Sequence, residues 1–180
     1  PKAFDVVSNM PRASRTLDRE FAVHRFAPTP PMPTYLVSIA VGNFEVLSGT
    51  AAGVPLRILT APGKREFARH AMRTTRQVLP YFSWYFGVPY ALPKLDQFAV
   101  PSVRWGAMED WGLISYAEDV FLVDPQRSSP ETVRDAYSII AHEIAHQWFG
   151  NLVTAASWEE IWLNEAFATW LERKTTDHFN

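Results

Sequence analysis

The sequence predicts an α+β protein in which a β-rich first part is followed by strands and helices. Runs of β-branched and aromatic residues, separated by turn signals, occupy the chain up to Thr60. A helical period begins at Lys64, and two amphipathic segments with helix start signals lie near the C-terminus. The 180 residues are 47% hydrophobic and 20% charged, as expected for a packed globular protein.

Composition and charge limit the classes of binding partner that the sequence predicts. Seventeen basic and 19 acidic residues give a net charge of −2 without a polybasic run, which argues against nucleic acid and against an anionic membrane surface. No apolar stretch is as long as the about 20 residues that a helix needs to span a bilayer. The chain has no cysteine, so nitrogen and oxygen atoms must hold any metal. The start at Pro1 lacks a signal peptide and an initiator Met, and we expect it to be cut from inside a longer protein.

Three strands and one loop are predicted in the first part. Phe4–Val7 and Tyr35–Val41 are rich in β-branched and aromatic residues, and Leu56–Thr60 alternates apolar with polar residues. The prolines of Pro28–Pro33 permit neither a helix nor a central strand, so this segment is expected to be a surface loop.

A domain boundary is placed near Ser48, so that residues 1–48 and 49–180 form two units. From Lys64 to about Phe86 the period is helical, and a cationic stripe on this helix is expected to be solvated. The apolar side consists of Phe67, Ala71, Val78, Phe82 and Tyr85, and the stripe of Arg65, Arg69, Arg73 and Arg76. Pro89 and Pro93 end the helix, and a strand over Leu95–Val100 leads into Gly106–Gly112.

Two further helices carry start signals of the capping-box type. Ser128 and Glu131 predict a helix from about Pro130 to Phe149, which Gly150-Asn151 would end. Its apolar stripe is formed by Val133, Tyr137, Ile140, Ile144 and Trp148. Ser157 and Glu160 repeat the signal before a helix from Ile161 to about His178, with Leu163, Phe167, Trp170 and Leu171 available for packing. The loop over 151–157 allows the second helix to fold back beside the first.

The segment His142-Glu143-Ile144-Ala145-His146 has the H-E-x-x-H spacing of zinc hydrolases. Residues four apart on a helix lie on one face, about 6 Å apart along the axis, so both imidazoles can bind one ion. A catalytic zinc typically has three protein ligands, and Glu165 on the next helix is the expected third. Glu143 lies on the same broad face and is expected to act as the general base.

The competing interpretation makes the two histidines buried structural residues and the acids ordinary surface groups. Other residues already provide the apolar packing of both helices, which disfavours this interpretation.

Four segments together resemble the M1 family of zinc aminopeptidases, within the gluzincin group. They are His142–Thr154, the eighteen residues between His146 and Glu165, Trp162–Glu165, and the upstream Gly106–Asp110. The resemblance covers essentially the whole chain. It implies that Thr29–Gly42 ends an N-terminal all-β domain and that Gly49–Asn180 is the first half of a thermolysin-like catalytic domain with a mixed sheet plus helices.

The resemblance also implies an activity and a site. Zn²⁺, one ion per chain, is expected on His142, His146 and Glu165, and a water activated by the metal would attack the peptide bond. The substrates would be peptides with a free N-terminus, whose ammonium group Glu109 would bind. The whole segment Gly106, Ala107, Met108, Glu109 and Asp110 is implied to bind substrate, with Gly106 and Ala107 letting the substrate backbone pair as an added strand. Asp110 departs from the family's Asn and adds a negative charge beside the amine site.

Truncation is the larger departure. The family's oxyanion-stabilising tyrosine and its helical C-terminal domain would lie downstream of Asn180, and neither Tyr116 nor Tyr137 can be transferred into that role. Because one oxyanion donor is typically worth about 10²–10³ in rate, the chain alone is expected to be weakly active or inactive. Unpaired strand edges predict self-association of the fragment.

Three alternatives stay open. An endopeptidase of the thermolysin kind is disfavoured by Glu109. An epoxide-hydrolysing relative within the same family is compatible with these residues. A non-catalytic scaffold is disfavoured by the intact His142, Glu143, His146 and Glu165, and it need not hold stoichiometric zinc.

Overall fold

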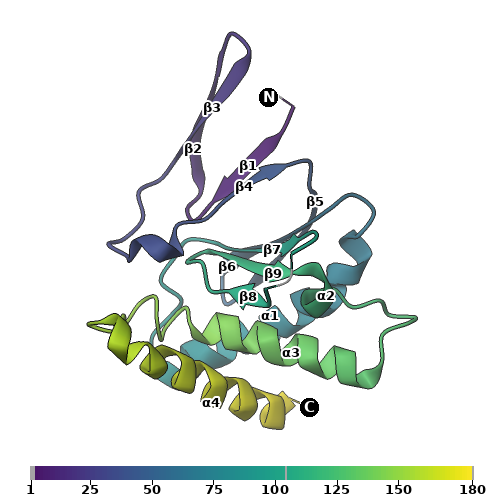
Figure 1. The fold of residues 1–180 in the computed structure, drawn as a ribbon, viewed down its shortest axis with the longest axis vertical. Helices are drawn as coiled ribbons and strands as arrows, with labels where there is room; N and C mark the ends of the chain where they lie inside the picture. Colours follow the sequence, from purple (N-terminus) through teal and green to yellow (C-terminus); the bar gives the residue numbers. More distant parts are fainter. Residues whose placement is uncertain (1–2, 104, 180) are drawn as a thin grey trace.

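A computed structural model of the chain describes residues 3–103 and 105–179. Pro1 and Lys2, at the predicted cut, and Asn180, at the end of the predicted second unit, lie outside these ranges. The predicted α+β class is confirmed, with a mixed sheet and helices packed together (Figure 1).

Nine strands and four α-helices make up the described structure. The strands are β1 (Asp5–Ser8), β2 (Arg12–Asp18), β3 (Phe21–Phe26), β4 (Ile39–Gly42), β5 (Glu45–Ala51), β6 (Val54–Thr60), β7 (Leu95–Val100), β8 (Ala107–Met108) and β9 (Leu113–Ala117). The helices are α1 (Arg69–Phe86), α2 (Glu118–Phe121), α3 (Pro130–Ala145) and α4 (Ile161–Phe179), and 3₁₀ turns cover Thr34–Leu36, Arg65–Ala68 and Trp158–Glu160.

The central sheet has five strands in the order β5-β6-β7-β9-β8. Strands β6, β7 and β9 are parallel, whereas β5 and β8 are antiparallel to their neighbours and form the edges. Because both edges leave backbone groups unpaired within the sheet, they are where the self-association predicted from the sequence would act. That association stays a prediction.

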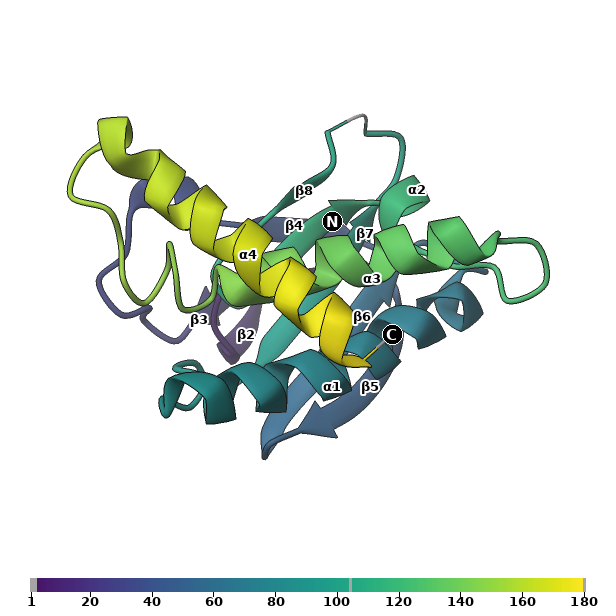
Figure 2. The same ribbon diagram turned by 90° about the horizontal axis from the view of Figure 1, so that it is seen from below.

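Helices cover one face of this sheet. Helices α1 and α3 lie beneath it, and α4 crosses α3 on the outside (Figures 1 and 2). Completely buried side chains join these layers into one core, including Val78 and Phe82 of α1, Ile140 and Ile144 of α3, and Leu171 of α4. Burial of this apolar surface is the main force that holds α3 and α4 side by side.

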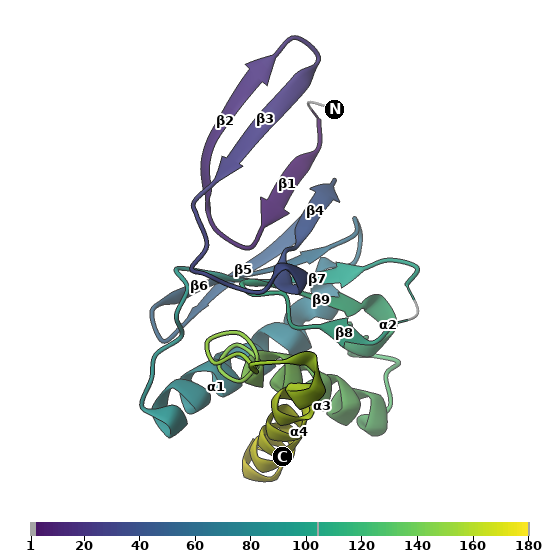
Figure 3. The same ribbon diagram turned by 60° about the vertical axis from the view of Figure 1, so that its left-hand side comes forward.

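The N-terminal strands lie on the other side of the sheet. Figure 3 shows the β1–β4 pair and the β2–β3 hairpin above the sheet, with the helices below. The hairpin was not predicted, because most of its residues are exposed and its tip, at Arg19 (φ 46°), carries no glycine signal.

The strand predictions are largely confirmed, with one correction. Strands β1, β6 and β7 lie where the sequence predicts them, and 28–33 is a loop. The strand predicted over Tyr35–Val41 is wrong in its first half, because Leu36 and Val37 donate to the carbonyls of Pro33 and Thr34 and close a 3₁₀ turn. Ser48 lies inside β5, and the division of the chain near it stays a prediction.

The helix predictions hold, but the caps differ. The cap of α3 is Ser129 rather than Ser128, and its hydroxyl accepts from the amide of Thr132. Ser157 makes no side-chain cap, because a 3₁₀ turn precedes α4. Helix α3 ends at Ala145, four residues early, because the carbonyls of His146 and Trp148 accept from Asn151 and Val153 in a tight turn. Phe167 and Trp170, offered for packing, remain 40% and 49% exposed.

No helix within residues 3–103 and 105–179 is both long and apolar enough to cross a membrane.

Candidate metal centre

The two histidines of the motif meet at the C-terminal end of α3. His142 lies in its last turn, and His146 is the residue that ends it, with its backbone still in the helical region. Their Nε2 atoms are 3.1 Å apart. His146 is buried, with only 1% of its side chain exposed, and His142 is exposed by 18%. The spacing of four therefore brings both nitrogens to one point although the helix ends earlier than predicted.

Glu165 completes a triangle of candidate ligand atoms. Its Oε2 lies 3.4 Å from Nε2 of His142 and 3.6 Å from Nε2 of His146. Zinc bonds of about 2.0–2.2 Å in a tetrahedron place ligand atoms about 3.3–3.6 Å apart. The two separations that involve Glu165 lie within this range and the 3.1 Å between the two histidine nitrogens lies just below it, so the three atoms are close to one face of such a tetrahedron and the donor set suits Zn²⁺.

Each imidazole has an oxygen partner on its other nitrogen. Nδ1 of His142 lies 3.2 Å from Oε2 of Glu172, and Nδ1 of His146 lies 2.9 Å from the carbonyl oxygen of Phe149. Such partners orient ligating histidines and leave Nε2 free to bind the ion. Glu172 was not among the predicted site residues. A usable signal was its spacing of seven from Glu165, which places both on one face of α4.

Glu143 lies beside this triangle without belonging to it. It is 6% exposed, and its Oε2 has no hydrogen-bond partner among the described residues. Burial raises the pKa of Glu143 to about 7, an effect that the two histidine charges oppose and that Glu109 and Glu165 support. A carboxyl group with such a pKa can both accept and return a proton near neutral pH.

Glu109 approaches the same centre from the edge of the sheet. It follows β8 directly, is 8% exposed, and one of its carboxylate oxygens lies within 4.8 Å of ligating atoms of Glu143 and His146. Its backbone carbonyl accepts from Nε2 of Gln147 (3.2 Å) and from Nδ2 of Asn151 (2.9 Å). The turn after α3 thus fixes Glu109 relative to the histidines. Gln147 and Asn151 were not predicted to have this role.

Other residues of the predicted substrate segment have different surroundings. Ala107 and Met108 form β8, which pairs with β9 on one side only and is the last strand of the sheet. Gly106 accepts from the amide of Ala117. Asp110 is 6% exposed and accepts from the hydroxyl of Ser115 (2.6 Å). Burial raises the pKa of Asp110 to about 6, although hydrogen bonds from Ser115 and Ser38 lower it.

The charges around the imidazoles favour a cation. Burial lowers the pKa of His142, yet the hydrogen bonds of Glu165 and Glu172 outweigh it and raise that pKa to about 10. The two histidines in turn hold the pKa of Glu165 well below its usual range. Protons on the imidazoles would compete with a metal ion for the same positions.

One hollow includes residues of the centre, and a second includes Asn164, the residue before Glu165. One of about 320 Å³ is lined by His142, Glu143 and Glu172 together with residues of α3. Another of about 310 Å³ includes Asn164 and Tyr35, and the hydroxyl of Tyr35 is buried without a partner among the described residues. Tyr35 was not predicted to lie here. Burial raises its pKa most, and the charges of Glu109 and Glu165 raise it further.

Two imidazoles, a carboxylate and an adjacent acid outside the ligand set define a candidate centre of the metallopeptidase class. The peptidase family M1 domain matches residues 70–180. The chain therefore belongs to peptidase family M1.

Relatives of known activity are similar over nearly the whole chain. Aminopeptidase N of Acetobacter pasteurianus is 43% identical over 173 residues, which cover 95% of this chain and 49% of the relative. Glutamyl aminopeptidase of Sus scrofa is 42% identical over 180 residues, which cover 99% of this chain and 19% of the relative. Leucyl aminopeptidase of Saccharolobus solfataricus is 40% identical over 173 residues, which cover 96% of this chain and 22% of the relative. The chain thus spans about half of the first relative and about a fifth of the other two.

Proposed function

We propose that this chain carries the catalytic centre of a zinc-dependent aminopeptidase, which removes single residues from the N-termini of peptides. The observation that carries the proposal is the placement of Glu143 and Glu109 beside the triangle of His142, His146 and Glu165. The family membership and the names of the relatives support the reaction class.

The ligand set fits zinc, which when bound would polarise the scissile carbonyl and make water more acidic. Glu143 takes a proton from the attacking water and returns it to the leaving amine, because its buried carboxyl group has a pKa of about 7. Glu172 and the carbonyl of Phe149 hold the imidazoles in place during this transfer.

Glu109 gives the reaction its exopeptidase character. A buried carboxylate close to the ligand atoms can bind the α-ammonium group of a peptide and so place the first peptide bond at the centre. The outer edge of β8 offers backbone groups with which an extended substrate can pair, as predicted for Gly106 and Ala107. Together these contacts favour removal of one residue at a time.

The chain by itself is proposed to be a weak catalyst. Tyr116 is completely buried in the core, and Tyr137 donates to the carbonyl of Thr175, so neither is free to stabilise an oxyanion. Loss of one such donor typically costs about 10²–10³ in rate.

The test compares one peptide in two forms, with a free and with an acetylated N-terminus, incubated with the zinc-loaded protein that carries this chain. We expect one zinc per chain and stepwise release of single residues from the free form only, read by mass spectrometry. Internal cleavage of the acetylated peptide would establish an endopeptidase instead. Absence of stoichiometric zinc would favour the alternative of a non-catalytic scaffold.

A further inference from the structure

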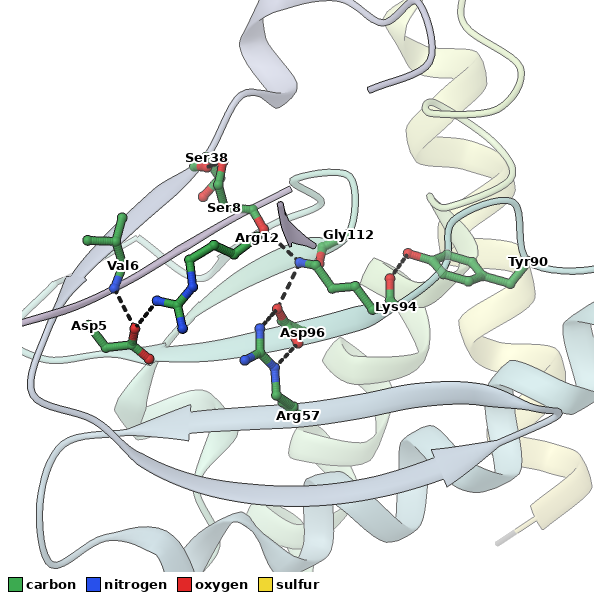
Figure 4. Close-up of polar contacts among 10 residues, drawn as sticks. All are labelled: Asp5, Val6, Ser8, Arg12, Ser38, Arg57, Tyr90, Lys94, Asp96 and Gly112. Atoms are coloured by element: carbon green, nitrogen blue, oxygen red, sulfur yellow. Dashed lines mark hydrogen bonds and ion pairs between the residues drawn. The ribbon is translucent and has the colours of Figure 1, made fainter. Parts of the chain in front are cut away.

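A cluster of buried polar groups holds the turn that follows Glu109. Figure 4 shows Lys94 at its middle, where Nζ donates to the carbonyls of Ser8 (2.6 Å) and Gly112 (2.7 Å). The same atom lies 2.8 Å from Oδ2 of Asp96, which is 0% exposed and also receives two bonds from Arg57. One ammonium group therefore ties the N-terminal segment, the start of β7 and the turn at Gly112 together.

Asn9 makes a second connection between the same parts. Its Nδ2 donates to the carbonyls of Leu36 (2.7 Å) and Trp111 (2.9 Å), and its Oδ1 accepts from the amide of Ser38 (3.0 Å). Asn9 is 2% exposed. All three of its bonds are to backbone groups. The side chain therefore fixes the positions of these backbone segments relative to one another and pairs with no charged group.

The turn leaves no room for adjustment at Gly112. Its φ is +82°, and a Cβ there would lie 2.5 Å from the carbonyl oxygen of Asn9. Its amide faces Oε1 of Gln147 at 3.4 Å, and the other end of that amide side chain donates to the carbonyl of Glu109. The backbone from Glu109 to Gly112 is thus held from both sides, by the turn after α3 and by Asn9 with Lys94.

Stability alone is a poor reason for this arrangement. Lys94 is 7% exposed, and removing an ammonium group and a carboxylate from water costs several kcal/mol per ion, so that apolar replacements of buried pairs are often as stable. Buried pairs fix one conformation in some proteins, and a functional group is held most exactly when the residues around it are locked by such contacts.

We propose that Asn9 and Lys94, here called the Asn9–Lys94 clamp, are positioning residues that set the reach of Glu109 toward the ammonium group of the substrate. The inference rests on the proposed function, because it assigns a purpose to the placement of Glu109. It makes the N-terminal segment a contributor to substrate recognition, although neither residue touches the substrate. A displacement of about 1 Å can cost on the order of 10² in the efficiency of a positioned group.

The experiment measures binding rather than turnover. In the zinc-loaded protein with Glu143→Gln, in which we expect cleavage to be slowed by about 10²–10⁴, the affinities of trialanine and of N-acetyl-trialanine are compared by calorimetry. The change in their ratio from parent to variant reports the amine contact, because the acetyl group is the same in both proteins. Lys94→Met and Asn9→Ala each remove one half of the clamp. Arg57→Met is the matched control, since Arg57 pairs with the same Asp96 but, among the described residues, has no hydrogen bond to the turn.

We expect the preference for the free amine to fall about tenfold or more with Lys94→Met and with Asn9→Ala, while the affinity for the acetylated peptide and the zinc content stay unchanged. Arg57→Met should keep the preference. If either clamp variant folds, binds zinc and retains the full preference, the clamp is only structural and the inference is wrong. If Lys94→Met does not fold, Asn9→Ala decides. If the parent itself shows no preference, the proposed role of Glu109 fails first.

Discussion

The Oε2 atom of Glu172 lies 3.2 Å from Nδ1 of His142, on the opposite side of the ring from the Nε2 that faces Glu165. A carboxylate in this position accepts the Nδ1 proton, so that Nε2 carries the lone pair that a metal needs. Helix α4 therefore supplies both a candidate ligand and the group that orients another ligand, two turns apart on one face.

Replacing this carboxylate tests that relationship. Glu172→Gln should lower zinc affinity about tenfold or more, because an amide is a weaker acceptor that leaves the imidazole less basic and less fixed. Competition with a chromophoric chelator measures the change. Asp177→Asn, an equal change of charge at an exposed position of α4, is the control and should leave affinity unchanged. Equal affinities for the parent and Glu172→Gln would show that the contact does not tune the site.

Glu143→Gln separates metal binding from proton transfer. The amide cannot accept a proton from water, so turnover should fall by about 10²–10⁴ while zinc content stays at one per chain. Steady-state kinetics and elemental analysis of the same preparation give both values. Glu131→Gln, at an exposed position in the first turn of the same helix, should be silent in both. Retained turnover in Glu143→Gln would refute the role of general base.

Asp110 should make the folded protein less stable as the pH rises. Its pKa is raised from 3.8 to about 6, so between these values the folded state binds more protons than the unfolded state, and the free energy of unfolding falls with pH. Asp110→Asn keeps an acceptor for Ser115 and removes this loss. We expect the variant to gain up to about 3 kcal/mol at pH 7.5 and nothing near pH 3.5, measured by urea unfolding.

The exposed Asp177→Asn serves as the control for that series, because a solvated carboxylate keeps its ordinary hydration in the folded state. A stability difference between Asp110→Asn and the parent that is the same at both pH values would mean that burial of the charge is not its cause.

Local sequence patterns anticipated the parts of the site that lie on regular helices. The spacing of His142 and His146 and the predicted helix around Glu165 identified three residues whose candidate ligand atoms lie close together. Glu172 was not predicted, because its spacing of seven from Glu165 places the two acids on one face of the helix but does not show that His142 lies beside it. Asn9 and Lys94 were missed for a different reason, since their partners lie up to 102 residues away and depend on how β1, β7 and β9 are arranged. Long-range contacts of this kind are set by tertiary packing, which periodicity does not report.

Gly112 and Gly53 offer a comparison of two glycines with nearly equal backbone angles. Their φ values are +82° and +80°, but a Cβ at Gly112 would lie 2.5 Å from the carbonyl oxygen of Asn9 and 2.8 Å from Leu92, whereas nothing lies within 4 Å of one at Gly53. Gly53→Ala should therefore cost only the backbone strain, about 1–2 kcal/mol. Gly112→Ala adds a collision with backbone to the same strain and should cost more than about 3 kcal/mol.

Chemical unfolding of both variants measures the two costs under the same conditions. The difference between them reports the close approach of Asn9 and Leu92 to the turn, since strain from the positive φ is common to both. Gly112→Ala that folds should also lose part of its preference for a free amine, because a shift of the turn away from Asn9 would move Glu109 as well. Equal costs for the two substitutions would show that the turn yields easily, and a turn that yields easily could not hold Glu109 in place.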